Sequence, residues 1–316
     1  MPFGMVLPMS APVAFLIFNR PEATAQSFAA IRHYRPEKLL IVADGPRPGH
    51  QMDAARTEEA RAIALNIDWP CEVLTNFSDT NLGCRRRIET GLDWVFNQVE
   101  EAIIIEDDCV PNEDFWPYCE ALLERYRDEP KIGAITGINV QDGQDRGDSS
   151  YYFSHYLHIW GWATWRRVWK EHDATMAYWP EWKNTAHWRA TFPDRAERLF
   201  WEEAFERVSH AEIDTWDYPL VASLRRLGLL AVTPNRNLVA NIGFSADATH
   251  TNRQAEFKTA PLGPLTHPKQ ITAHLEADAY TFEHHCGGTL IRRHYFKRRW
   301  RLMKWRLRWL LGRKSK

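Results

Sequence analysis

The stretch Ala102-Ile103-Ile104-Ile105-Glu106-Asp107-Asp108 joins an apolar run directly to three carboxylates. Three consecutive isoleucines are typical of a parallel strand that is buried on both faces. The acids would then stand at the carboxyl edge of a sheet, where open α/β sheets bind ligands. Because like charges repel, a hard cation with oxygen ligands, Mn²⁺ or Mg²⁺, would stabilise such a cluster. A solvated acidic turn after a strand is the alternative interpretation.

Apolar runs on both sides of this strand predict the rest of an α/β fold. Further strands are expected at residues 12–18, 38–43, 71–75 and 132–138, and helices at 22–34, 53–66 and 115–128, with another that follows the arginines at 85–87 and runs through Val99. This alternation predicts a doubly wound, Rossmann-like, mostly parallel central sheet flanked by helices. The motifs Gly-x-Gly-x-x-Gly and Gly-x-x-x-x-Gly-Lys-Ser/Thr are absent from the sequence, which excludes the dinucleotide and P-loop cradles that they form.

Polar side chains follow the predicted strands. Asp44 comes after the second strand and could accept a hydrogen bond from a base or ribose, although the turn chemistry of Asp-Gly-Pro explains it as well. Residues 85–87 are three arginines at the start of a predicted helix. Helix N-termini attract anions and arginine adds charge-assisted contacts, so a pyrophosphate would fit there. A solvated charge run is the alternative.

Composition indicates a globular protein with an unusual tryptophan content. Hydrophobic residues make up 44% and charged residues 26% of the 316 positions, which excludes a disordered chain. Seven of the 15 tryptophans lie between residues 160 and 188. Indole rings can stack on sugars and donate to hydroxyls, but core packing is the favoured interpretation for most of the seven.

The cysteines and the chain ends bear on the compartment. Five cysteines without a Cys-x-x-Cys pair argue against a zinc site and a disulfide framework, and fit a reducing cytoplasm. We find no signal-peptide pattern and no uninterrupted apolar stretch of about 18 residues, so no membrane-spanning helix is expected. A cytoplasmic protein is therefore predicted.

The C-terminal segment is strongly basic. Residues 291–316 contain twelve Lys or Arg and no acid, which leaves 28 basic against 41 acidic residues in the rest of the chain. On a helix, most of the apolar side chains would lie opposite a basic side, with arginines intruding. This pattern predicts a basic amphipathic helix on an anionic membrane surface, and no nucleic-acid partner. The alternative is a tail that packs on the acidic body of its own chain.

Taken in order, several motifs resemble those of inverting GT-A glycosyltransferases. The chain is similar to the N-acetylglucosaminyltransferase I family and to bacterial family 2-like glycosyltransferases, some labelled haemolysin-like, over nearly the whole part before the tail. The motifs are Asn19-Arg20-Pro21, Asp44-Gly45, Asn81-Leu82-Gly83, Glu106-Asp107-Asp108, Trp160-Gly161-Trp162, Asp214-Thr215-Trp216-Asp217 and His250.

The resemblance implies an inverting, metal-dependent enzyme. A sugar would move from a nucleotide-sugar, with a UDP-sugar as the expected donor, to a hydroxyl of a glycan or lipid-linked glycan. The hexosyl- and N-acetylhexosaminyltransferases are the enzyme classes implied. Residues 1–140 would form the nucleotide-sugar-binding half, 141–270 the acceptor-binding and catalytic half, and 271–316 an extension ending in the membrane-surface helix. The protein would act on the inner face of the cytoplasmic membrane.

The resemblance also implies roles for individual residues. Asp108 and His250 would hold Mn²⁺ or Mg²⁺. Asp217 would be the catalytic base, with Asp214 as the fallback, although an Asp shortly before Pro219 also suits a helix cap. The acceptor would contact Trp160, Trp162 and Trp216. The donor would contact Arg20, Asp44, Asn81, Arg86, Glu106 and Asp107.

Two rival functions remain. A non-catalytic carbohydrate- or membrane-binding protein could keep the same fold, because fold does not dictate function. A nucleotidyltransferase that makes the activated sugar is disfavoured, because the early Gly-rich phosphate loop of that class is absent.

Overall fold

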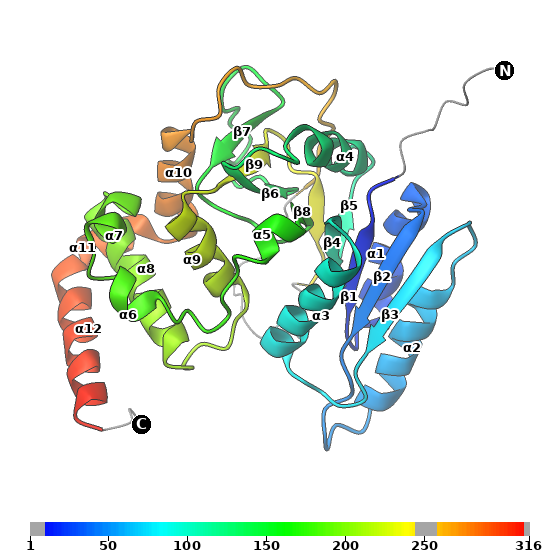
Figure 1. Cartoon of the computed structure of the whole chain (residues 1–316), viewed down its shortest axis with the longest axis horizontal. Coiled ribbons are helices and arrows are strands. Elements are labelled where there is room, and N and C mark those ends of the chain that lie inside the picture. Colours follow the sequence, from blue (N-terminus) through cyan, green and yellow to red (C-terminus); the bar gives the residue numbers. More distant parts are fainter. Residues whose placement is uncertain (1–9, 244–257, 313–316) are drawn as a thin grey trace.

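A large mixed sheet runs through the computed structural model, which describes residues 10–243 and 258–312 (Figure 1). Its strand order is β3-β2-β1-β4-β8-β6-β9-β7, and β7 and β8 run antiparallel to their neighbours. The predicted α/β class with a mostly parallel central sheet flanked by helices is confirmed. The strands are β1 Val13–Ile17, β2 Lys38–Ala43, β3 Glu72–Phe77, β4 Glu101–Glu106, β6 Ile132–Thr136, β7 Tyr151–Ser154, β8 Trp162–Trp165 and β9 Leu230–Pro234.

The first half of the sheet is Rossmann-like. Strands β3, β2, β1 and β4 are parallel, and β1, β2 and β4 are Val-, Ile- and Leu-rich runs that are buried almost throughout. Helix α1 (Pro21–Tyr34) begins with a proline, whose fixed φ suits a first helical turn. Helices α2 (Asp53–Leu65) and α3 (Cys84–Gln98) complete this half, so the predicted elements lie close to their predicted bounds.

Beyond β4 the sheet also contains antiparallel strands, in keeping with the expectation of a mostly parallel sheet. Strand β8 lies between β4 and β6 and pairs with both in the antiparallel direction. Gly161 has a φ of 67°, and a Cβ built on it would lie 2.7 Å from a methyl carbon of Val239. Only glycine fits this turn without strain, and the turn leads the chain into β8.

A two-stranded antiparallel sheet closes the carboxyl side of β4. It consists of β5 (Cys109–Pro111) and β10 (Val239–Asn241), with Cys109 opposite Asn241. Because β5 follows the acidic triplet directly, this pairing fixes the position of Asp108. Helix α4 (Phe115–Arg125) follows and packs against β6 and β8.

Most tryptophans of the aromatic segment are core residues, as favoured by the sequence. Trp162 is 1% exposed and stacks on Trp216, which is 3% exposed, with ring centroids 6.0 Å apart. Trp179, Trp182 and Trp188 build a second core with residues from the helices that follow. The helices of this region are α5 Arg166–Trp169, α6 Trp179–Trp182, α7 Ala186–Thr191, α8 Arg195–Ser209 and α9 Asp217–Leu227.

The C-terminal segment forms three helices, and the last of them is the basic one. They are α10 (Leu275–His285), α11 (Gly288–Arg293) and α12 (Tyr295–Leu310), and the chain bends between the last two at His294. Figure 1 places α12 at the edge of the molecule that lies opposite β3 and α2. Within the described ranges, the structure contains no helix with the length and apolarity needed to cross a bilayer.

Replacing Trp162 by alanine is expected to lower the free energy of unfolding by about 3–5 kcal/mol, because it leaves a cavity against Trp216. The exposed Trp300 provides the control, since Trp300→Ala should change stability by no more than about 0.5 kcal/mol. Urea unfolding followed by circular dichroism measures both. Equal, small changes would contradict the core assignment of Trp162.

Candidate active site

The acidic triplet lies where β4 ends, beside the end of β1. Leu16 of β1 pairs with Glu106 of β4, so the chain leaving β1 passes next to the triplet. Arg20, three residues beyond β1, places its Nη1 2.7 Å from Asp108 Oδ2 and 3.4 Å from Asp107 Oδ1. The structure therefore brings together four of the residues that sequence analysis assigned to donor and metal binding.

Asp107 is the buried member of the triplet. Its Oδ2 accepts a hydrogen bond from the Phe18 amide at 3.1 Å, and its backbone carbonyl accepts one from Ser27 Oγ at 3.0 Å. Burial, followed by the charge of Asp108, raises the pKa of Asp107 to about 7 despite the nearby Arg20.

Glu106 carries the same electrostatic signature. Burial raises the pKa of Glu106 well above its ordinary value, and the charges of Asp108, Asp107 and Asp217 raise it further. One guanidinium does not balance these carboxylates. A cluster of this kind gains stability when a cation binds.

Asp217 lies within electrostatic reach of the triplet. It is the first residue of α9, and its carboxylate accepts a hydrogen bond from Thr215 Oγ1. Burial raises the pKa of Asp217, while bonds from Thr215 and from backbone amides at the helix start oppose the shift. The position thus has features of both interpretations: a helix N-terminus holds the carboxylate, and the charge of that carboxylate is felt at Glu106.

Asp214 and Cys84 mark the same region. Asp214 is exposed. Loss of hydration, followed by the charges of Glu106, Asp214 and Asp217, raises the pKa of the Cys84 thiol to about 12. Cys84 begins α3, so the charges at the end of β4 and just before and at the start of α9 act on the start of this helix.

Asp44 and Asn81 are brought together, but as partners of each other. Asp44 Oδ1 accepts from the amides of Gly45 and Leu82, both at 2.9 Å. Its Oδ2 accepts from Asn81 Nδ2 at 2.9 Å and from the Gly83 amide at 3.1 Å. Four bonds fill the acceptor capacity of a carboxylate. Asp44 therefore fixes the loop before α3 and has no lone pair left for a ligand in this arrangement.

A polar network that sequence analysis missed holds the loop before α1. The buried Asp53 accepts from Asn19 Nδ2 at 2.8 Å, and from Arg47 Nε and Nη2 at 2.6 and 2.9 Å. The Arg47 side chain, opposed by burial, keeps the pKa of Asp53 well below its usual range. Arg56 Nε donates to the Asn19 carbonyl at 2.9 Å. These bonds position the backbone from which Arg20 reaches the triplet.

Residues 241–243 form the other wall around Asp108 and were also missed. The Ile242 amide donates to the Asp108 carbonyl at 2.8 Å. A Cβ on Gly243 would lie 2.1 Å from Asp108 Oδ2, so only glycine allows this approach. Asn241 Oδ1 accepts from the Gly243 amide at 2.8 Å and adds an oxygen near the acids. His250, the other predicted metal ligand, lies outside the described residues.

The remaining predicted residues lie in three different settings. Trp162 and Trp216 pack face to face inside the core and leave no ring face open for stacking on an acceptor. Trp160 is partly buried just before β8, and Arg86 is exposed in the first turn of α3. The prediction that these two rings contact the acceptor is therefore wrong. They instead pack β8 against the start of α9.

The oxygen donors suit a hard divalent cation. Across residues 10–243 and 258–312, no three His, Cys, Asp or Glu side chains are arranged to hold a metal ion by themselves. Mg²⁺ is usually held by one or two carboxylates together with phosphates of the substrate, and Mn²⁺ also prefers oxygen ligands. Asp108 and Asp107 fit that partial set, because Arg20 is the cation that pairs with them within residues 10–243 and 258–312.

Comparisons with known proteins give only distant likenesses. No protein-family model and no curated protein matches the chain. The mannosyltransferase PcManGT from Pyrobaculum calidifontis, solved with GDP-Man and Mn²⁺, is 14% identical, with a TM-score of 0.35 and coverage of 69% of this chain and 74% of that one. A putative glucose-1-phosphate thymidylyltransferase from Bacillus anthracis, solved with sucrose, is 10% identical, with a TM-score of 0.32 and coverage of 51% and 74%. At these TM-scores neither structure is evidence for a shared function.

Replacing Asp44 by alanine is expected to lower the free energy of unfolding by about 1–3 kcal/mol, because the amides of Leu82 and Gly83 lose their acceptor. Asp214→Ala, at an exposed carboxylate, should change it by no more than about 0.5 kcal/mol. Chemical denaturation compares the two. A stable Asp44→Ala protein that binds nucleotide poorly would instead favour direct contact with the donor.

Proposed function

We propose that this protein is an inverting, metal-dependent glycosyltransferase of the GT-A type that uses a nucleotide-sugar. One observation carries the proposal: an excess of carboxylates at the end of β4, with Arg20 as the cation that contacts them within the described residues, and with the partly buried Asp217 in the same electrostatic environment. A diphosphate with its divalent cation is a ligand that such a site can bind, and Asp217 would act on a second substrate. The motif order that resembles GT-A enzymes adds to this reasoning.

The donor half of the proposal assigns the anionic end of the nucleotide-sugar to the triplet. Asp108, with Asp107 and with His250 from beyond the described part, would hold Mn²⁺ or Mg²⁺. When bound, the metal would supply Lewis-acid stabilisation of the diphosphate leaving group. Arg20 already lies on the same carboxylates, and Arg86 would add positive charge from α3. A UDP-sugar is the proposed donor, with Glu106 and Asp107 near its sugar and ribose.

The catalytic half assigns proton transfer to Asp217. The acceptor hydroxyl gives its proton to the Asp217 carboxylate. At the same time the hydroxyl oxygen bonds to the anomeric carbon of the donor sugar, and the bond between that carbon and the diphosphate breaks. A carboxylate whose pKa is raised by burial is a stronger base than an exposed one. We assign no second carboxylate as a nucleophile, so the displacement is direct and inverts the anomeric carbon.

The acceptor is proposed to be a glycan or a lipid-linked glycan. Trp160, partly buried beside the buried Trp162, is the aromatic residue proposed to contact it. In this division residues 1–140 bind the donor and residues 141–270 bind the acceptor. Transfer of a hexose or an N-acetylhexosamine fits the same chemistry.

Asp108→Ala is expected to abolish metal-dependent binding of UDP while the protein stays folded, because it removes the carboxylate proposed to hold the cation. Isothermal titration of UDP with Mn²⁺ measures the affinity. Glu113→Ala, at an exposed acid five residues away, is the control and should bind as the wild type does. Unchanged affinity of Asp108→Ala would exclude Asp108 as a metal ligand.

Asp217→Asn is expected to retain donor binding and to lose about 10²–10⁴-fold in the rate of transfer or donor hydrolysis, because the amide preserves the shape but not the base. Asp214→Asn is the matched variant and should react at nearly the wild-type rate. The opposite pattern would assign the base to Asp214.

A metal-dependence assay separates the enzyme from its rival. Incubation with a panel of nucleotide-sugars should release free sugar or sugar product only when Mn²⁺ or Mg²⁺ is present. Binding of carbohydrate or membranes without any turnover, with or without metal, would favour the non-catalytic binding protein.

A further inference from the structure

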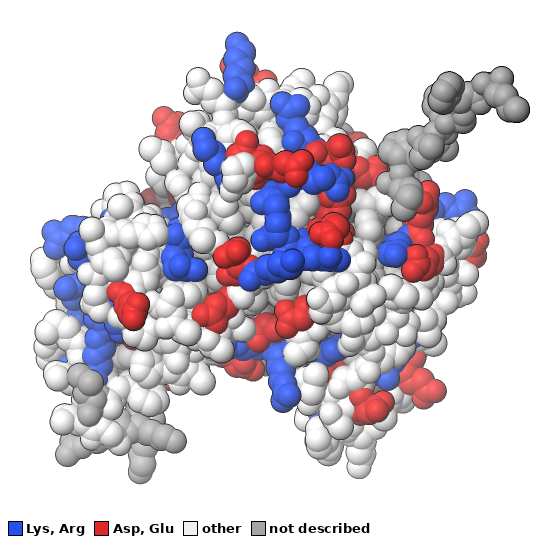
Figure 2. All heavy atoms as spheres, viewed as in Figure 1, with Lys and Arg blue, Asp and Glu red and all other residues white. Residues whose placement is uncertain are grey.

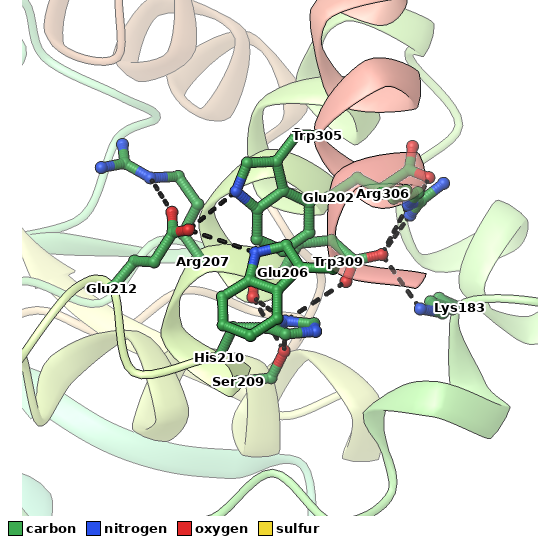
Figure 3. Close-up of polar contacts among 10 residues, drawn as sticks. All are labelled: Lys183, Glu202, Glu206, Arg207, Ser209, His210, Glu212, Trp305, Arg306 and Trp309. Carbon is green, nitrogen blue, oxygen red and sulfur yellow. Dashed lines mark hydrogen bonds and ion pairs between the residues drawn. The ribbon is translucent and has the colours of Figure 1, made fainter. Parts of the chain in front are cut away.

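Helix α12 is locked onto α8 through its inward side. Arg306 donates from Nε to Glu206 Oε1 and from Nη2 to Glu202 Oε1, both at 2.8 Å. The indole Nε1 atoms of Trp305 and Trp309 both donate to Glu212 Oε1, at 2.8 and 3.3 Å. Figure 3 shows these side chains converging between the two helices. The basic segment is therefore partly a docked element of the fold, as the second sequence interpretation held.

Glu206 fixes the geometry of the contact between α12 and α8. Its side chain is only 1% exposed, and Lys183 Nζ lies 3.0 Å from its Oε1. Burial alone would raise the pKa of Glu206, but Lys183 and Arg306 bring it below its ordinary value. A buried carboxylate without these partners would be strongly destabilising. The rotation of α12 about its own axis is consequently fixed.

The outward side of α12 exposes a stripe of large apolar side chains. Phe296 is 82% exposed, Trp300 56%, Met303 53% and Leu307 55%. Their spacing of four, three and four residues places them on one helical face. Leu302, on the inward face, is buried. A contiguous exposed apolar stripe of this kind marks an interaction surface.

Cations line both flanks of this stripe. Arg299 on one flank lines a cavity of about 280 Å³, together with Arg189 and Arg195 of the neighbouring helices. On the other flank, none of the exposed cations forms an ion pair with an acid in the described part of the chain. These are Lys297, Arg301, Lys304 and Arg308.

The inward cations behave differently. Arg298 is bound by Glu203, and Arg306 is bound by Glu202 and Glu206. Figure 2 shows Lys and Arg side chains along the edge that α12 occupies. The fold thus neutralises the cations that face α8 and leaves those that face solvent without acidic partners.

We propose that the outward face of α12 docks on a bilayer that contains anionic lipids. Aromatic and aliphatic side chains would enter the headgroup and acyl boundary, and the flanking cations would meet lipid phosphates. A second copy of the chain fits poorly, because like-charged flanks would face each other. Nucleic acid would use the cations but not the apolar stripe. The proposal does not depend on the proposed catalytic function.

The contact between α12 and α8 determines how the protein would lie on the membrane. A helix of 16 residues is about 24 Å long and would lie in the plane of the interface. The inward cations would stand farther from the lipid, by up to about 10 Å, one helix diameter. The Debye length is about 8 Å at physiological ionic strength, so those cations would be screened. Only the outward cations should contribute to binding.

Co-sedimentation of the full chain with vesicles tests this proposal. The protein should sediment with vesicles of phosphatidylcholine and phosphatidylglycerol in equal parts, less at high salt, and poorly with pure phosphatidylcholine. Lys304→Gln, at the cation whose Nζ lies 3.5 Å from the centre of the Trp300 ring, should weaken binding about fivefold. Arg298→Gln removes one positive charge from the side that faces α8 and should leave binding nearly unchanged. The triple variant Phe296→Ser, Trp300→Ser, Leu307→Ser should stay in the supernatant.

Three results would overturn the proposal. The first is equal weakening by Arg298→Gln and Lys304→Gln, which would indicate a diffuse charge effect. The second is wild-type sedimentation of the triple variant. The third is a dimer, detected by light scattering, that the triple variant loses while vesicle binding is unchanged. Circular dichroism and urea unfolding of each variant verify that the fold is intact.

Discussion

The contact of Arg20 with Asp107 and Asp108 is the interaction on which the site depends. It exists because β1 and β4 are parallel neighbours, so the loop after β1 lies beside the acids after β4. Asp53 and its partners hold that loop from behind. In the described part of the chain, one cation pairs with these carboxylates, which leaves an excess of negative charge at the carboxyl edge of the sheet. The rest of the proposed chemistry follows from that imbalance.

A second constraint acts at the opposite edge of the molecule. Glu206 is buried, so it requires Lys183 and Arg306 as partners, and this requirement attaches the C-terminal helix to α8. The same attachment orients the remaining face of α12 toward solvent. The two sequence interpretations of the basic segment, docking on the body and binding a membrane, therefore concern different faces of one helix. The first is observed, and the second remains a proposal.

Local patterns predicted the fold far better than they predicted the site. Continuous apolar runs identified β1, β2 and β4, because strands buried on both faces need them. The antiparallel insertion of β8 was missed, since its direction depends on pairing with distant strands. The bond between Asp44 and Asn81 joins residues 37 positions apart, and that between Asn19 and Asp53 joins residues 34 apart. No local pattern could indicate that these polar residues bind one another.

Thermal unfolding with a panel of nucleotide-sugars, each with and without Mn²⁺, tests the central claim most directly. Ligands that bind only the folded state raise its melting temperature. If the carboxylate excess at the end of β4 is a site for a metal and a diphosphate, one nucleotide-sugar should raise the melting temperature with Mn²⁺, and a chelator should abolish the shift. An equal shift without metal, or no shift with any nucleotide-sugar, would contradict the account.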